Sequence, residues 1–186
     1  MSLTISASSV DALIANPNSQ PGYSSSSSII ITGNITTTQA TNLNGVDATY
    51  ITAILFEDTV SNLSSIAVDN ATRTKLNKFT LTLSDTSATA AELTAVQALT
   101  RIQVGADNLT SIESSSSSDI ISLISASLVP SGVSADPITV SDTTINATTL
   151  NTIDTYFSGA ITATAATTIT GPVADILTAM STGDIT

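Results

Sequence analysis

The sequence of 186 residues contains no cysteine, no histidine and no tryptophan. Without cysteine there can be no disulfide framework and no thiolate chemistry. Without cysteine and histidine, the common zinc and transition-metal sites are excluded as well. A serine nucleophile would have to work with a base other than histidine. The missing residue types therefore remove most familiar catalytic and metal centres.

Positive charge is scarce. The chain has four lysines and arginines against 15 aspartates and glutamates, for a net charge of −11. Three of the basic residues lie close together, at Arg73, Lys75 and Lys78, whereas Arg101 stands alone. A chain of this charge repels phosphate backbones and anionic membrane surfaces. We therefore expect no nucleic-acid binding.

Long apolar runs are missing too. The longest compact runs, Ile29 to Ile31 and Ile51 to Phe56, have the length of a strand, so we expect no membrane insertion. The segment from Met1 to Ser6 lacks the basic and apolar regions of a secretory signal peptide. Hydrophobic residues still make up 41% of the chain, with only 3% aromatic. This composition predicts a thin core of small aliphatic side chains.

The sequence does contain a repeat. Thr143–Ile145 recurs as Thr167–Ile169, and Gly159 recurs as Gly183, in both cases 24 residues later. A period of this size is typical of one supersecondary unit in a stacked-repeat protein. Such a unit cannot bury its apolar faces alone, so its copies must stack.

Each repeat reads as a strand, a turn and a short helix. The clearest helix is expected from Ala90 to Leu99, behind a capping box formed by Thr89 and Glu92. We predict an α/β fold, or a mainly β fold if the helices are short. In either case it is a repeat solenoid of about 24-residue strand–turn–short-helix units with parallel strands. The apolar helix residues predicted to be buried against the strands are Leu93, Val96, Leu150, Ile153, Ile176 and Leu177.

Other short runs have the composition of strands. They are Leu3–Ala7, Ile29–Thr32, Tyr50–Phe56, Ile66–Val68, Phe79–Leu83, Ile102–Val104, Ile138–Val140 and Ala160–Thr164. Two serine tracts, 24–28 and 114–118, are expected in loops or at element boundaries.

The regularity of the repeats divides the chain. Residues 1–78 are predicted to form irregular N-terminal repeats, a candidate anchoring or capping region, and residues 79–186 the regular repeats of one continuous solenoid. The sequence stops in mid-repeat at Asp184–Thr186, as if a longer fibre continued. A bare solenoid end exposes strand edges and apolar helix flanks. We therefore expect more chain, a second copy or another protein to cover this end.

Two carboxylates occupy matching places in aligned repeats. Asp85 and Asp142 each follow a strand and precede a threonine, a pattern typical of an Asx-turn or a helix cap. The alternative is a ladder of calcium sites, with Asp85 and Asp142 as weak candidate ligands. Because the EF-hand loop and the glycine-rich calcium nonapeptides are missing, we favour the turn or cap and predict no other cofactor.

Catalytic arrangements are equally weak. A Ser–Lys dyad could involve Lys75 or Lys78, but the segment from Thr72 to Lys78 is typical of an exposed helix face. Glu57 and Asp58 are adjacent, so in a strand they would point to opposite faces. We therefore predict that the protein is not an enzyme.

Pairs of threonines separated by one residue suggest one further function, ice binding. A flat threonine array could bind ice, but β-branched strand propensity explains such pairs more simply. The pairs are Thr80 with Thr82, Thr162 with Thr164, and Thr168 with Thr170.

The segment from Ile138 to Asp154, and its earlier copy from Leu81 to Leu93, resemble a known type of repeat. They are similar to the Ser/Thr/Ala/Asp-rich tandem repeats of very large surface proteins from marine cyanobacteria. Appendage and fibre proteins of the phages that infect these bacteria carry similar repeats. The resemblance covers about half of the chain and implies an extracellular or virion location with an adhesive or spacer role.

Together these features predict a structural protein. We expect a repeat building block of a surface appendage or fibre, first of all a phage virion component that associates with itself or with other virion proteins. A start at Met1 without an export signal fits assembly inside a host cell. The alternative is a secreted bacterial or cyanobacterial cell-surface or matrix adhesin. A ligand- or ice-binding solenoid module is a second alternative.

Overall fold

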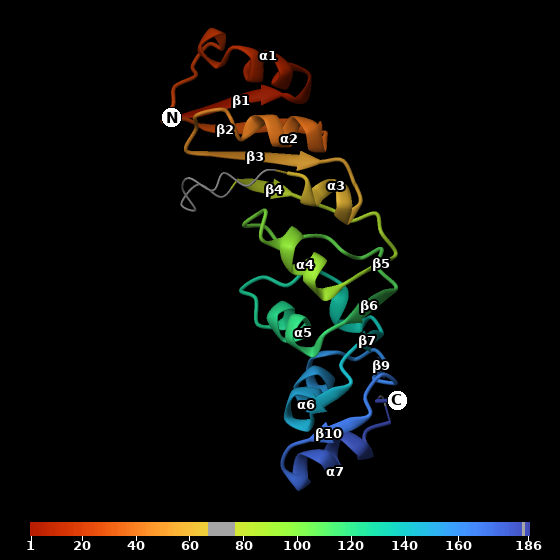
Figure 1. Cartoon of the computed structure of the whole chain (residues 1–186). Coiled ribbons are helices and arrows are strands. Elements are labelled where there is room, and N and C mark those ends of the chain that lie inside the picture. The colour runs from red at the N-terminus through yellow and green to blue at the C-terminus, as the bar shows by residue number, and fades with distance from the viewer. Residues whose placement is uncertain (67–76, 184) are drawn as a thin grey trace. The chain divides into compact units, whose positions relative to one another are not determined.

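A computed structural model describes residues 1–66, 77–183 and 185–186. The chain forms two compact units, and Figure 1 traces it through both. Unit 1 contains Met1–Ser84 together with Ala95–Gly105, and unit 2 contains Asp85–Thr94 together with Ala106–Thr186.

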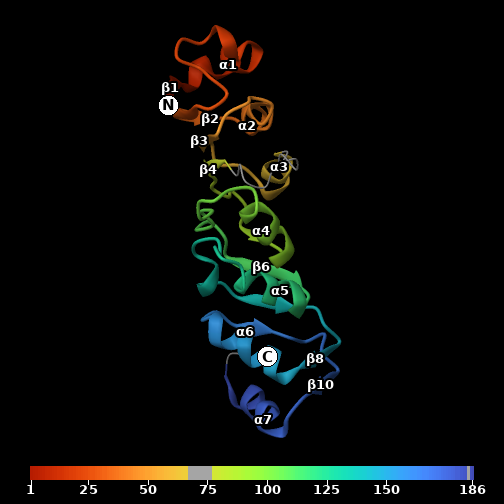
Figure 2. The ribbon, with the colours of Figure 1, turned by 90° about the vertical axis from the view of Figure 1, so that its left-hand side faces the viewer.

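Unit 1 is built on a parallel sheet whose strands follow one another in sequence order. The strands are β1 (Ser2–Ser6), β2 (Ser28–Ile35), β3 (Tyr50–Leu55) and β4 (Lys78–Thr80). The α-helices of this unit are α1 (Val10–Ala15), α2 (Thr37–Leu43) and α3 (Val60–Ser64), and two short 3-10 turns lie at Ala7–Ser9 and Pro17–Ser19. In Figure 2 the strands line one side of this unit and the helices the other.

Unit 2 contains two parallel sheets. One sheet has the order β5 (Ser87–Ala88), β6 (Ser111–Ser115), β7 (Ile138–Val140) and β9 (Ile161–Thr162), and the other pairs β8 (Thr144–Asn146) with β10 (Thr168–Thr170). The helices are α5 (Ser117–Ile124), α6 (Ala147–Tyr156) and α7 (Val173–Ser181), with a 3-10 turn at Val133–Ala135. Helix α4 (Ala90–Gln97) contributes residues to both units.

The strand registers keep a nearly constant spacing along the sequence. Paired residues lie between 20 and 26 positions apart, and β8 pairs with β10 at a spacing of 24. Helices lie between consecutive paired strands, as a parallel connection requires. The prediction of an α/β protein with parallel strands is therefore confirmed.

The core is a thin layer of aliphatic side chains at equivalent places in successive segments. In unit 1, Ile29 is paired in register with Ile51, and both are at most 2% exposed. Leucines at matching positions of α1, α2 and α3 are fully buried, namely Leu13, Leu43 and Leu63. Burial of one such side chain contributes about 1.5–3 kcal/mol.

Most of the predicted core positions are confirmed. Four of them are at most 1% exposed: Leu93, Val96, Leu150 and Ile153. The prediction is wrong for Leu177, which is 63% exposed, and Ile176 is only partly buried. Ala179 is the buried residue of α7. The difference arises because, in the described part of the chain, α7 packs on α6 but has no further segment beyond it.

Local signals set several element boundaries. The capping box of α4 is present: the Glu92 N–H donates to Thr89 Oγ1 at 3.3 Å, and the Thr89 N–H donates to Glu92 Oε2 at 2.9 Å. The second serine tract spans the end of β6, the N-cap Ser116 and the start of α5, so its prediction as an element boundary is confirmed.

The strand predicted at Ile102–Val104 does not form. The buried side chain of Gln97 binds both ends of this run, because its amide Nε2 donates to Ile102 O at 3.0 Å and the Val104 N–H donates to its Oε1 at 2.9 Å. Strand pairing resumes at Gly105, which forms a parallel bridge with Thr82. The predicted strand at Ile66–Val68 falls mostly outside the described residues.

Hydroxyl side chains add hydrogen bonds between successive segments. The Thr110 N–H and Oγ1 both donate to Thr86 O, at 2.8 and 3.0 Å. Thr167 makes the same double contact with Thr143 O, at 2.9 and 3.2 Å. Each donor lies 24 residues after its acceptor. Threonine therefore supplies a second donor where a segment begins to pair with the one before it.

Two glycines at the same repeat position provide a test of this packing. A Cβ built on Gly159 would lie 2.4 Å from the backbone of Asp136, whereas nothing lies within 4 Å of a Cβ on Gly183. Gly159→Ala should therefore lower the free energy of unfolding by about 1–3 kcal/mol, because backbone must move to admit the methyl group.

Gly183→Ala is the matched control and should change the free energy of unfolding by less than about 0.5 kcal/mol. Urea unfolding followed by circular dichroism measures both variants. Equal effects of the two substitutions would contradict the packing of Gly159 on the preceding segment.

Candidate functional site

The two candidate calcium ligands lie in separate loops of unit 2. Asp142 follows β7, and Asp85 lies in the loop before β5. Asp142 Oδ2 accepts the backbone N–H of Ser117 at 2.6 Å, and Ser117 is the first residue of α5. The carboxylate thus caps the helix of the preceding segment.

The same kind of contact recurs in both units. Asp58 Oδ2 accepts the hydroxyl of Thr37, the first residue of α2, at 2.7 Å. Asp175 Oδ2 accepts the hydroxyl of Thr148, in the first turn of α6, at 2.5 Å. The N-terminus of a helix carries partial positive charge and unpaired N–H groups, so a carboxylate there is stabilising. A carboxylate of one segment therefore bonds to the first helical turn of the segment before it.

Asp58 has the most complete set of donors. Besides Thr37, its Oδ1 accepts the Thr59 N–H at 2.9 Å and Asn62 Nδ2 at 2.6 Å. Burial raises the pKa of Asp58, but the hydrogen bonds from Asn62, Thr37 and Thr59 outweigh it and hold the pKa below its usual value. Glu57 and Asp58 lie after the end of β3 rather than within a strand. The pair is thus no facing arrangement for acid–base catalysis.

Asp136 is shifted in the opposite direction. Burial raises the pKa of its carboxyl above the usual value. The backbone of Asp136 is the surface on which Gly159 packs.

Of the two lysines considered for a Ser–Lys dyad, Lys78 lies within the described residues and Lys75 does not. Lys78 Nζ lies 4.6 Å from the centroid of the Tyr50 ring, within cation–π distance. Lys78 is exposed as predicted, but the prediction of a helix is wrong for it, because it is the first residue of β4. Lys75, and most of the segment from Thr72 to Lys78 that was predicted as an exposed helix face, lie outside the described residues.

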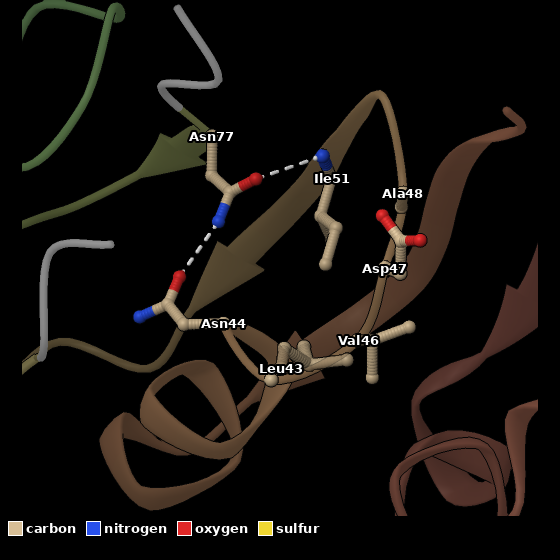
Figure 3. A pocket seen from close by; sticks show the side chains of 8 residues that line it. Leu43, Asn44, Val46, Asp47, Ala48, Ile51 and Asn77 are labelled. Carbon is tan, nitrogen blue, oxygen red and sulfur yellow. Dashed lines mark hydrogen bonds between the residues drawn. The ribbon is translucent and has the colours of Figure 1, made fainter. Parts of the chain in front are cut away.

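One hollow of about 200 Å³ lies beside the loop after α2. Figure 3 shows its polar wall, where Asn77 Nδ2 donates to Asn44 Oδ1 at 2.9 Å and Asn77 Oδ1 accepts the Ile51 N–H at 3.0 Å. The two amides bind one another and the edge of β3. They act as a structural bridge between segments.

The threonine pairs make short rows. Thr168 pairs in register with Thr144, but Thr170 pairs with Asn146. In unit 1, Thr80 pairs with Ile54, which is 49% exposed. The rows therefore offer little regular repetition of threonine.

Within residues 1–66, 77–183 and 185–186, no three His, Cys, Asp or Glu side chains gather as a metal site. Across the same ranges, no helix has the length and apolarity needed to cross a membrane. Calcium binding by Asp85 or Asp142 stays the alternative to their role in a turn or cap.

The chain was also compared with known proteins. No protein-family model, curated protein or solved structure matches it.

The Asp58 contact predicts a pH dependence of stability. Because its pKa is lowered on folding, Asp58 stabilises the fold above its unfolded pKa of about 3.9, and this contribution is lost as the pH falls through the folded pKa. Asp58→Asn should cost about 1 kcal/mol at pH 7, and the deficit relative to wild type should shrink below about pH 4.

Urea unfolding at a series of pH values measures this deficit. Thr37→Val, which removes one donor without changing the carboxylate, should raise the pKa of Asp58 toward its ordinary value. A deficit for Asp58→Asn that stays constant between pH 7 and pH 3 would show that the Asp58 charge does not matter.

Proposed function

We propose that the chain is a structural repeat protein whose segments stack as an α/β solenoid and serve as the building block of a surface appendage or fibre. The observation that carries this proposal is the pairing of strands in parallel, in the order of the sequence, at a spacing near 24 residues. Stacked repeats have this register because each repeat contacts chiefly its neighbours.

The stability of the segments supports a structural role, because each segment depends on the segments next to it. Each segment contributes one short strand and one short helix, too little to bury a core alone. Stability then comes from the interfaces between segments, through buried aliphatic pairs such as Ile29 with Ile51 and carboxylate contacts such as Asp58 with Thr37. A protein of this kind can form a long surface by repeating the same few kinds of residue in every segment.

The location proposed is a phage virion, on the resemblance of Ile138–Asp154 to the repeats of cyanobacterial surface proteins and of phage appendages. The acidic composition, with a net charge of −11, supports contact with protein partners in preference to nucleic acid or anionic lipid. The proposed partners are copies of the chain itself or other proteins of the same assembly.

The proposal predicts where the protein is found. An antibody raised against the purified chain should label a discrete appendage on purified phage particles in electron microscopy. The matched control is the surface and soluble fractions of uninfected host cells, which should not react. Labelling of the cell surface alone would support the secreted adhesin, and label confined to the cytoplasm would contradict both structural assignments.

A further inference from the structure

The sheet of unit 1 has one face toward the helices and an opposite, outer face, as Figure 2 shows. Side chains alternate between these two faces along each strand. On the outer face, Ile30 of β2 is 39% exposed and Ile54 of β3 is 49% exposed. Phe56, 56% exposed, continues the alternation of β3, because its N–H still donates to Ile35 O. We call Ile30, Ile54 and Phe56 the β3 patch.

The β3 patch lies on the two central strands of its sheet. Strands β1 and β4 are paired on either side of β2 and β3. Ile30 is paired in register with Thr52, two residues before Ile54, so the apolar side chains of the patch are neighbours. The exposure of the patch therefore does not depend on a missing neighbour at either edge of the sheet. Clustered large apolar side chains on a surface are typical of a contact site.

The charges at the two ends of the β3 patch have opposite signs. Strands β1 to β4 contain none of the 15 aspartates and glutamates of the chain. At the end where β3 begins, Lys78 Nζ lies 4.6 Å from the centroid of the Tyr50 ring. At the end where β3 finishes, Glu57 and Asp58 directly follow Phe56, and Glu57 is exposed. The outer face thus has a positive end and a negative end.

We propose that the β3 patch packs on the β3 patch of a second copy of this chain, face to face about a two-fold axis that makes the strands of the two copies antiparallel. Two sheets that pack face to face lie about 10 Å apart. The antiparallel orientation brings the positive end of one copy to the negative end of the other, so Lys78 meets Glu57 and Tyr50 meets Phe56. Each of these contacts forms twice, because a two-fold contact uses the same surface on both copies.

The charges decide both the occupant and the orientation. The parallel orientation of the same two faces would bring the two positive ends together and the two negative ends together, where like charges repel. In the antiparallel orientation, each end of the face meets the opposite charge on an identical surface. This self-complementarity is the reason for assigning the contact to a second copy of the chain.

This inference deepens the proposed structural role and rests on it for its meaning in an assembly, but its test is separate. In sedimentation equilibrium, the wild-type chain should form a reversible dimer. Ile54→Asp should weaken this dimer by about tenfold or more, because a carboxylate would be placed among apolar side chains. Leu177→Asp, at a 63% exposed site in unit 2, is the control and should leave the dimer unchanged. Circular dichroism should show native folding in both variants, because both sites are exposed.

Reversal of charge tests the pairing of the two ends. Lys78→Glu should weaken the dimer, because two negative ends would then meet. Addition of Glu57→Lys to the same chain should restore the dimer, because the two ends would again have opposite signs. A double variant that dimerises as weakly as Lys78→Glu alone would contradict the contact of Lys78 with Glu57 and overturn the proposal.

Introduced cysteines test the orientation, because the chain has no cysteine of its own. In a mixture of Tyr50→Cys and Phe56→Cys chains under mild oxidation, disulfides should join the two variants faster than they join either variant to itself. Positions 50 and 56 lie opposite one another in the antiparallel contact, whereas two copies of position 50 are about six residues of strand, or roughly 20 Å, apart.

Two further results would overturn the proposal. Faster linkage of each cysteine variant to itself would show the parallel orientation. A wild-type chain that stays monomeric at all concentrations would exclude the dimer, while labelling of phage particles would still support the proposed function.

Discussion

The parallel pairing of strands from successive segments, within each unit, is the constraint on which the structure depends. Every segment is too short to bury its own strand and helix, so its apolar residues need the neighbouring segment. The register brings Ile51 onto Ile29 and Ile161 onto Ile138. It also aligns Thr167 with the carbonyl of Thr143, where the side chain adds a second donor to the backbone contact. The abundance of threonine and small aliphatic residues follows from this one requirement.

The same constraint explains why equivalent residues behave differently along the chain. Gly159 packs on the backbone of Asp136, whereas Gly183, at the same repeat position, has open space around it. Ile153 on α6 is fully buried, whereas Leu177 on α7 is 63% exposed. Neither difference comes from local sequence. For Leu177 the difference follows from the lack of a further described segment against α7, whereas nothing in the structure explains the open space at Gly183.

Features set by neighbours in the sequence could be predicted, and features set by register could not. The capping box of Thr89 and Glu92 and the buried face of α6 depend on spacings of three or four residues, so the sequence alone indicates them. The Gln97 side chain binds the backbone of Ile102 and Val104, so these groups do not pair with a neighbouring strand. Strand propensity, which depends on residue type alone, cannot indicate this contact. The contact of Asp142 with Ser117 joins residues 25 positions apart, so it requires the register of two segments to be known. The place of Asp142 between a strand and a threonine indicates a cap, but it does not indicate which helix is capped.

Deletion of one whole segment tests the stacking of repeats most directly. Removal of residues 138–160 places Ile161 where Ile138 now pairs with Ile112, so the register is preserved. The shortened chain should keep its circular dichroism spectrum in proportion to its length and should unfold cooperatively in urea. Removal of residues 138–149, half a segment, should abolish cooperative unfolding of unit 2, because apolar residues would then face turns. Equal tolerance of the two deletions, or collapse of the fold in both, would contradict the proposed stacking of repeats.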